Sequence, residues 1–124
     1  MSKRSIARIA AIVVIAGVSG FGLKQYRCKQ RNAAFAQRVE SIKQDAREGL
    51  TIGTKKGDVA GFFVEHSIPF TIYGSDAFGS LRTSGCAPFG CGTDSALIGV
   101  RVKLDEEGTV IEEPTVSGLY TDCL

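Results

Sequence analysis

An uncharged, apolar segment near the N-terminus, Ile9 to Leu23, constrains this chain more than any other feature. It follows the cationic sequence MSKRSIAR, and no acidic residue occurs before Glu40. A cationic start followed by an apolar stretch is typical of segments that are exported or inserted into a membrane. A spanning helix needs about 20 apolar residues and a signal-peptide core only about 7–15. If Arg8 snorkels to the surface, residues 6–23 form the membrane contact.

Two fates are open for this segment. The small residues Val18-Ser19-Gly20 suit a signal peptidase, so cleavage near Gly20 would yield a periplasmic or secreted protein. However, the chain after Leu23 continues as KQYRCKQRNAAFAQRVESIKQ, without Pro or Gly to break a helix that leaves the bilayer. This continuity favours an uncleaved signal anchor in residues 1–23. The expected topology is single-pass in the inner (cell) membrane, with the C-terminal domain outside the cytoplasm.

Charge is divided unevenly along the rest of the chain. Residues 24–56 carry nine Lys or Arg and three Asp or Glu, whereas residues 57–124 carry three and ten. A basic segment beside a membrane attracts anionic headgroups, each cation contributing about 1 kcal/mol, although a solvated helix face fits the pattern equally well. Nucleic-acid binding is not expected, because the folded part is acidic. The candidate lipid contacts are Lys24, Arg27, Lys29 and Arg31.

Two helices are predicted after the apolar segment. Residues 24–49 are expected to form a juxtamembrane amphipathic helix, because apolar residues recur every three or four positions from Asn32 onwards and Gly49 is a stop signal. A second helix is predicted to begin at Thr54 as N-cap and to end by about His66. The predicted buried faces are Phe35, Val39, Ile42, Ala46 and Leu50 on the first helix, and Val59, Phe62 and Phe63 on the second.

Beyond Pro69 the apolar period changes to two, which predicts strands. Residues 77–94 are expected to form a loop rich in Gly, Ser and Thr, and Asp105-Glu106-Glu107-Gly108 to form a hairpin turn. Pro114 indicates an edge or a bulge in the returning strand. Residues 50–124 are therefore expected to form a small disulfide-bonded α+β domain, with two helices packed on a three-stranded antiparallel β-meander. The three strands are predicted at residues 70–73, 98–104 and 110–120.

Four cysteines follow the export signal, which predicts two disulfides. The predicted hairpin register brings Cys91 opposite Cys123 and leaves Cys86 for Cys28. The rival pairing closes a local Cys86–Cys91 loop and joins Cys28 to Cys123. The residues leave these two pairings open.

Catalytic chemistry finds little support in the sequence. A zinc site using Cys86, Cys91 and the single histidine, His66, has the wrong cysteine spacing for a zinc knuckle. The sequence contains no C-x-x-C redox motif, nucleophile elbow or phosphate-binding glycine loop. No cofactor and no enzymatic activity are therefore expected.

Residues 50–113 resemble the SmpA/OmlA (BamE-like) family of small bacterial envelope proteins. The resemblance lies in Leu50-Thr51-Ile52-Gly53-Thr54, followed by Val59, Phe62-Phe63 and Pro69, and in the later hairpin IGVRVKLDEEGTV. It implies a two-helix layer on a three-stranded antiparallel sheet, and a role in binding protein partners or lipid in the envelope. This chain departs from the family pattern: it lacks a lipidated cysteine, Ser67-Ile68-Pro69 replaces the Gly-x-Pro exit, and the cysteine-rich loop is additional.

The expected function is that of an extracytoplasmic interaction or scaffolding domain, anchored in the membrane and contacting an envelope protein. A cleaved, secreted binding or inhibitor protein is the first alternative. A thiol or metal-dependent enzyme that uses Cys86, Cys91 and His66 is the second.

Overall fold

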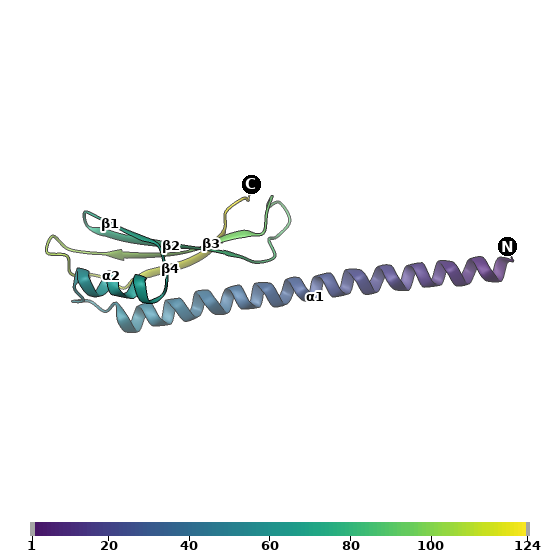
Figure 1. Cartoon of the computed structure of the whole chain (residues 1–124), viewed down its shortest axis with the longest axis horizontal. Coiled ribbons are helices and arrows are strands. Elements are labelled where there is room, and N and C mark those ends of the chain that lie inside the picture. Colours follow the sequence, from purple (N-terminus) through teal and green to yellow (C-terminus); the bar gives the residue numbers. More distant parts are fainter. Residues whose placement is uncertain (1, 124) are drawn as a thin grey trace.

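A computed structural model describes residues 2–123 of the chain. Two helices precede four strands, and the first helix projects far beyond the sheet (Figure 1). The folded part lies along the C-terminal half of that helix, and its N-terminal half stands free. The elements are α1 (Lys3–Gly49), α2 (Lys56–Glu65), β1 (Phe70–Tyr73), β2 (Asp76–Ser84), β3 (Ser95–Lys103) and β4 (Thr115–Tyr120).

Helix α1 joins the predicted membrane segment and the predicted juxtamembrane helix without a break. Its 47 residues correspond to a length of about 70 Å at the usual rise per residue. Ser2 caps its start through a hydrogen bond from the Ser5 backbone N–H, and it ends at Gly49 as predicted. The apolar segment and the folded domain are therefore connected by one continuous helix.

The predicted apolar face of α1 packs against the sheet. Ile42, Ala46 and Leu50 are buried, and Phe35 and Val39 lie against the same core. The close approach depends on a glycine in β4, because a Cβ on Gly118 would lie 2.7 Å from Val39 Cγ2 and 2.8 Å from Phe35 Cζ. The period of the sequence thus identified the correct face of the helix.

Helix α2 begins later than predicted but buries the predicted side chains. Its N-cap is Lys55, without a side-chain cap, because the preceding Thr54 carbonyl accepts a hydrogen bond from Val110 N–H at 2.8 Å. This bond ties the start of the helix to the β3–β4 connection. The helix ends before His66 as expected, and Val59, Phe62 and Phe63 are buried.

The sheet has four strands in the order β1-β2-β3-β4, all antiparallel, so the prediction of three strands is wrong. The additional strand is β2, which occupies much of the expected loop at residues 77–94. Its alternation was hidden because two inward-facing positions are Ala77 and Gly79. Gly79 is required there, since a Cβ would clash with the ring of Phe63.

The β3–β4 hairpin has the predicted turn but an irregular return. Gly108 has a φ of +80°, as its place in the turn requires. Residues 111–114 do not form strand, and only a bridge between Leu104 and Val110 precedes β4. Between this bridge and the pair Arg101↔Thr115, the chain from Val110 to Thr115 takes five residue steps, whereas β3 takes three from Leu104 to Arg101. The irregularity lies where Pro114 predicted it.

Both helices cover the same face of the sheet, and the other face is open (Figure 1). The core lies between them, because alternate residues of β2, β3 and β4 point towards the helices. The molecule is thus a two-layer α+β domain on a projecting helix. The buried core residues supplied by the sheet and the β3–β4 connection are Ala77, Ile98, Val100, Val102, Leu104, Val110 and Val116.

Candidate functional site

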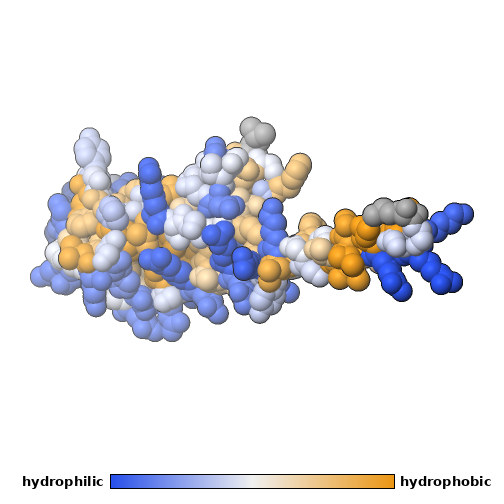
Figure 2. Space-filling model, turned by 45° about the vertical axis from the view of Figure 1, so that its right-hand side comes forward, coloured by the Kyte–Doolittle hydropathy of each residue, from blue (hydrophilic) through white to orange (hydrophobic). Residues whose placement is uncertain are grey.

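The projecting half of α1 exposes a continuous apolar surface. Figure 2 shows this surface as an orange band between a charged tip and the folded domain. The helix is long and apolar enough to cross a membrane or to act as a signal sequence, and the apolar stretch is wholly unburied. The exposed large side chains are Ile6, Ile9, Ile12, Val13, Val14, Ile15, Val18, Phe21 and Leu23.

The four predicted lipid-contact residues form a basic collar directly after this surface. Lys24, Arg27, Lys29 and Arg31 are all exposed on α1. Arg31 Nη1 lies 3.8 Å from Asp94 Oδ2, a solvent-exposed pair that contributes little stability. Within residues 2–123, the other three members of the collar form no ion pair. Their charge is therefore available to an external anion.

Two disulfides hold the loop that connects β2 and β3. Cys28–Cys86 joins this loop to α1, and Cys91–Cys123 joins it to the chain after β4. Of the two pairings left open by the sequence, the one based on the hairpin register is present. From the pair Ala96↔Tyr120 to the bridge Cys91↔Cys123, the chain takes five residue steps before β3 and three after β4. This difference compensates for the opposite difference near Pro114, so Cys91 still faces Cys123.

A polar contact reinforces the disulfide between α1 and the loop. Asn32 Oδ1 accepts hydrogen bonds from Cys86 N–H at 2.9 Å and from the Tyr120 hydroxyl at 2.6 Å. The same hydroxyl lies 3.2 Å from the Cys86 carbonyl oxygen. Gly85 permits this packing, because a Cβ there would lie 3.2 Å from Asn32 Oδ1 and would clash with the hydroxyl. Loop, helix and β4 meet at this point.

The sequence analysis did not identify this contact. A signal was present, since Asn32 lies four residues after Cys28 and therefore on the same face of α1. Its partner Tyr120 is 88 residues away, a separation that no local pattern bridges.

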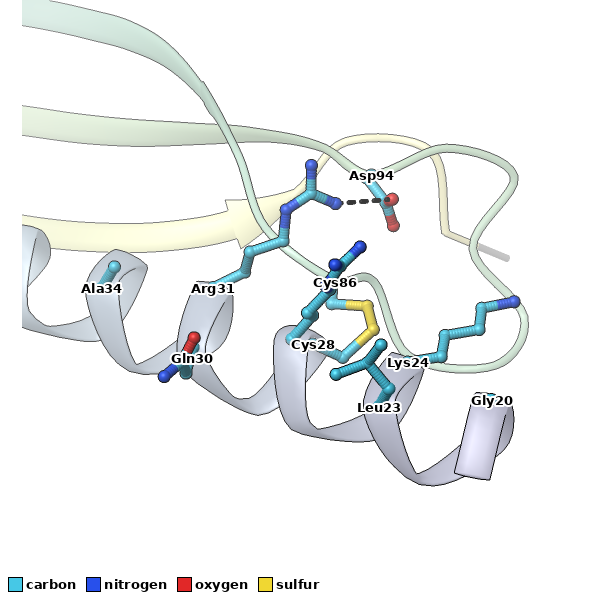
Figure 3. A pocket seen from close by; sticks show the side chains of 10 residues that line it. Gly20, Leu23, Lys24, Cys28, Gln30, Arg31, Ala34, Cys86 and Asp94 are labelled. Carbon is cyan, nitrogen blue, oxygen red and sulfur yellow. Dashed lines mark ion pairs between the residues drawn. A yellow bond between two sulfur atoms is a disulfide. The ribbon is translucent and has the colours of Figure 1, made fainter. Parts of the chain in front are cut away.

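An open groove of about 660 Å³ runs beside the Cys28–Cys86 disulfide. Leu23 and Lys24 line its end towards the N-terminal half of α1, and Arg31 and Asp94 line it near the sheet (Figure 3). The groove therefore places the end of the apolar segment, part of the basic collar and the disulfide-bonded loop side by side.

The open face of the sheet, here called the outer sheet face, carries apolar side chains flanked by arginines. Phe78 and Leu119 are 50% and 52% exposed. Phe78 lies next to Gly99, and a Cβ on Gly99 would be 3.7 Å from the Phe78 ring. Because Gly99 has no side chain, the middle of the face is not raised by a side chain there. The strand register places these outward positions side by side: Phe78, Ser80 and Arg82 on β2, Leu97, Gly99 and Arg101 on β3, and Ser117 and Leu119 on β4.

His66 does not meet the cysteines but links the two helices. Its Nδ1 lies 2.9 Å from the Phe62 carbonyl oxygen and its Nε2 lies 3.1 Å from Asp45 Oδ2. Because both partners only accept hydrogen bonds, the ring satisfies both as an imidazolium. Burial lowers the pKa of His66, but the hydrogen bonds to Asp45 and Phe62 and the charges of Asp45 and Glu65 outweigh it, so the pKa is raised above 6.5.

The alternative of a zinc site requires Cys86, Cys91 and His66 to lie together, and the structure does not group them. Cys86 and Cys91 belong to different disulfides. Among residues 2–123, no three His, Cys, Asp or Glu side chains are grouped so that they could hold a metal ion.

The chain matches no protein-family model, no curated protein and no solved structure.

Proposed function

We propose that this chain is a membrane-anchored, extracytoplasmic interaction or scaffolding domain of the bacterial cell envelope. The observation that carries the proposal is the continuity of α1, which runs from the exposed apolar surface into the core at Ile42 and Ala46. The Cys28–Cys86 disulfide and Asn32 hold the sheet to the same helix. The anchor therefore sets both the height and the orientation of the domain, which suits a docking module.

The disulfides support a location outside the cytoplasm. All four cysteines are paired, and disulfides persist in oxidising compartments such as the bacterial periplasm. Basic residues flank the apolar segment on both sides, so their distribution gives no orientation on its own. The compartment argument accordingly rests on the cysteines.

The outer sheet face is the proposed contact with an envelope protein. Its apolar side chains are Phe78 at one end and the pair Leu97 and Leu119 at the other, with Arg101 opposite Phe78 and Arg82 opposite Leu97. The positions between them are Ser80, Gly99 and Ser117. Protein interfaces are enriched in aromatic residues and arginine around a desolvated centre. The resemblance to the SmpA/OmlA family implies the same kind of role, although the sheet here has four strands rather than three.

Site-specific photo-crosslinking in cells of the native host tests this function. A photoreactive residue at Phe78 or Leu119 is expected to give the same discrete adduct, because both positions lie on one face. The matched control is Val64 on α2, which is 69% exposed and belongs to the helical layer. An equal adduct from all three positions, or none from the outer sheet face, would count against a docking role for this face.

A further inference from the structure

The loop between the two disulfides presents one aromatic side chain on a tight turn. Cys91 N–H donates to the Pro88 carbonyl oxygen at 3.2 Å, and Gly90 has a φ of +100°. This is the pattern of a type II turn, with Phe89 and Gly90 at its two central positions. Phe89 has a relative exposure of 109%, higher than any other large apolar residue of the described chain.

The turn, here called the Phe89 turn (residues 86–91), is fixed at both ends. Cys86 and Cys91 are bonded to α1 and to the chain after β4. Ala87 N–H donates to Asp94 Oδ1 at 2.8 Å, and Gly92 N–H donates to the Asp122 carbonyl oxygen at 2.7 Å. A constrained turn of this kind exposes its phenyl ring without the freedom to fold it back onto the domain.

The Phe89 turn lies at the level where the apolar surface of α1 ends. Ala87 and Pro88 line a second groove together with Phe21 and Lys24. Figure 3 shows the loop passing beside Lys24 and continuing in the direction of Gly20. The turn is thus beside the last apolar turn of the helix and not at the distal end of the sheet.

The length of the apolar segment brings this level to the bilayer surface. Residues 6–23 span about 27 Å as a helix, slightly less than a hydrocarbon core of about 30 Å. Full coverage of the core therefore places Leu23 and Lys24 at the boundary with the headgroups. The unpaired charges of Lys24, Arg27 and Lys29 follow within about 8 Å along the helix axis and complement anionic headgroups.

We propose that the Phe89 turn is a second membrane contact, in which Phe89 inserts at the boundary between headgroups and acyl chains of the bilayer that α1 spans. This inference rests on the proposed membrane anchor and adds a fixed tilt to it. With one contact on the helix and another on the loop, the outer sheet face is held in one direction relative to the membrane plane.

Single-tryptophan variants of the full chain test the inference, since the sequence contains no tryptophan. The protein is reconstituted into vesicles of mixed zwitterionic and anionic phospholipids that carry quenchers at shallow or deep positions. Phe89→Trp is expected to show blue-shifted emission and quenching mainly by the shallow quencher. Tyr73→Trp is the matched control, because Tyr73 is 85% exposed and lies at the β1–β2 turn, at the opposite end of the sheet (Figure 1).

A third variant, Ile15→Trp, separates failure of the inference from failure of the anchor. If the deep quencher acts on Ile15→Trp while Phe89→Trp emits as in water, the anchor stands and the Phe89 contact is overturned. If neither position is quenched, the anchor and the inference are both overturned. Quenching of Tyr73→Trp equal to that of Phe89→Trp also defeats the inference, because it would mean that the whole domain lies on the membrane without a specific contact.

Discussion

Asn32 is a single polar side chain on which three elements converge. Its amide oxygen holds the backbone of Cys86 and the hydroxyl of Tyr120, while Phe35, one turn further along α1, packs with the Tyr120 ring at a centroid distance of 5.7 Å. His66 has a comparable role at the other end of the helix–sheet interface, where it joins Asp45 on α1 to the end of α2. Both side chains thus add hydrogen bonds between elements that are otherwise held by apolar packing.

Replacing Asn32 by Ala removes both hydrogen bonds while the disulfide remains. We expect the free energy of unfolding to fall by about 0.5–1.5 kcal/mol, because two solvent-exposed hydrogen bonds are lost and the Tyr120 hydroxyl keeps the Cys86 carbonyl oxygen as an acceptor. Denaturant titration of the oxidised full chain in detergent measures the change. Gln30→Ala is the control on the same helix, since Gln30 is exposed and its removal is expected to be nearly neutral.

His66 predicts a pH dependence of stability. Because its folded pKa is raised, its contribution is complete below the unfolded pKa of about 6.5 and is lost as the pH rises through the folded value. The stability difference between the native chain and His66→Gln should therefore be larger at acidic than at alkaline pH. Asp45→Asn should reduce this dependence, and a difference that is constant across the range would refute the cationic contact. Thermal unfolding at a series of pH values provides the measurement.

At the scale of elements, close packing of α1 on β4 depends on Gly118. Its missing side chain leaves room for Phe35 and Val39. Gly61 on α2 is not constrained in this way, because a Cβ there would meet no atom within 4 Å and its backbone is helical. The two positions make opposite predictions for the same substitution.

Gly118→Ala should destabilise the domain by about 1–3 kcal/mol, because the added methyl group overpacks the interface between helix and sheet. Gly61→Ala should instead stabilise it by about 1 kcal/mol through helix propensity. Chemical denaturation of both variants under identical conditions tests the pair. A stabilising effect at Gly118 would show that α1 does not approach β4 as described.

Elements with a strong local period could be predicted, and those defined by distant contacts could not. The stripe from Phe35 to Leu50, the buried face of α2 and the turn at Gly108 follow from spacing and glycine geometry. Strand β2 was not predicted because Gly79 and Ala77 interrupt its apolar alternation, and the need for glycine at position 79 is explained only by the nearby ring of Phe63. Helix α2 starts later than predicted because the backbone N–H of Val110, a residue distant in sequence, donates a hydrogen bond to the Thr54 carbonyl oxygen.

The candidate site was predictable to the same extent. The basic collar and the four cysteines could be identified as sequence features, and the hairpin register suggested the observed pairing without excluding its rival. The contact of Asn32 with Tyr120 and the position of Ala87 and Pro88 beside the end of the apolar surface depend on how the sheet is placed on α1. Neither has a sequence period that reveals it.

At the scale of the whole molecule, α1 joins the proposed anchor to the domain. The helix is continuous over 47 residues, and the sheet is fixed to it by the core, by Asn32 and by Cys28–Cys86. In the proposed topology, this attachment holds the outer sheet face at a set height above the bilayer. The central claim is therefore that the chain remains uncleaved and that its domain folds in an oxidising compartment.

Intact-mass measurement of the protein from the membrane fraction of its native host, after thiol alkylation without reduction, tests that claim most directly. The account predicts a full-length chain without any alkylation, because α1 is retained and all four cysteines are paired. A chain shortened to a cleavage point near Gly20 would contradict the anchor and favour the secreted binder. A full-length chain alkylated at all four cysteines would place the domain in the reducing cytosol and contradict the proposed topology.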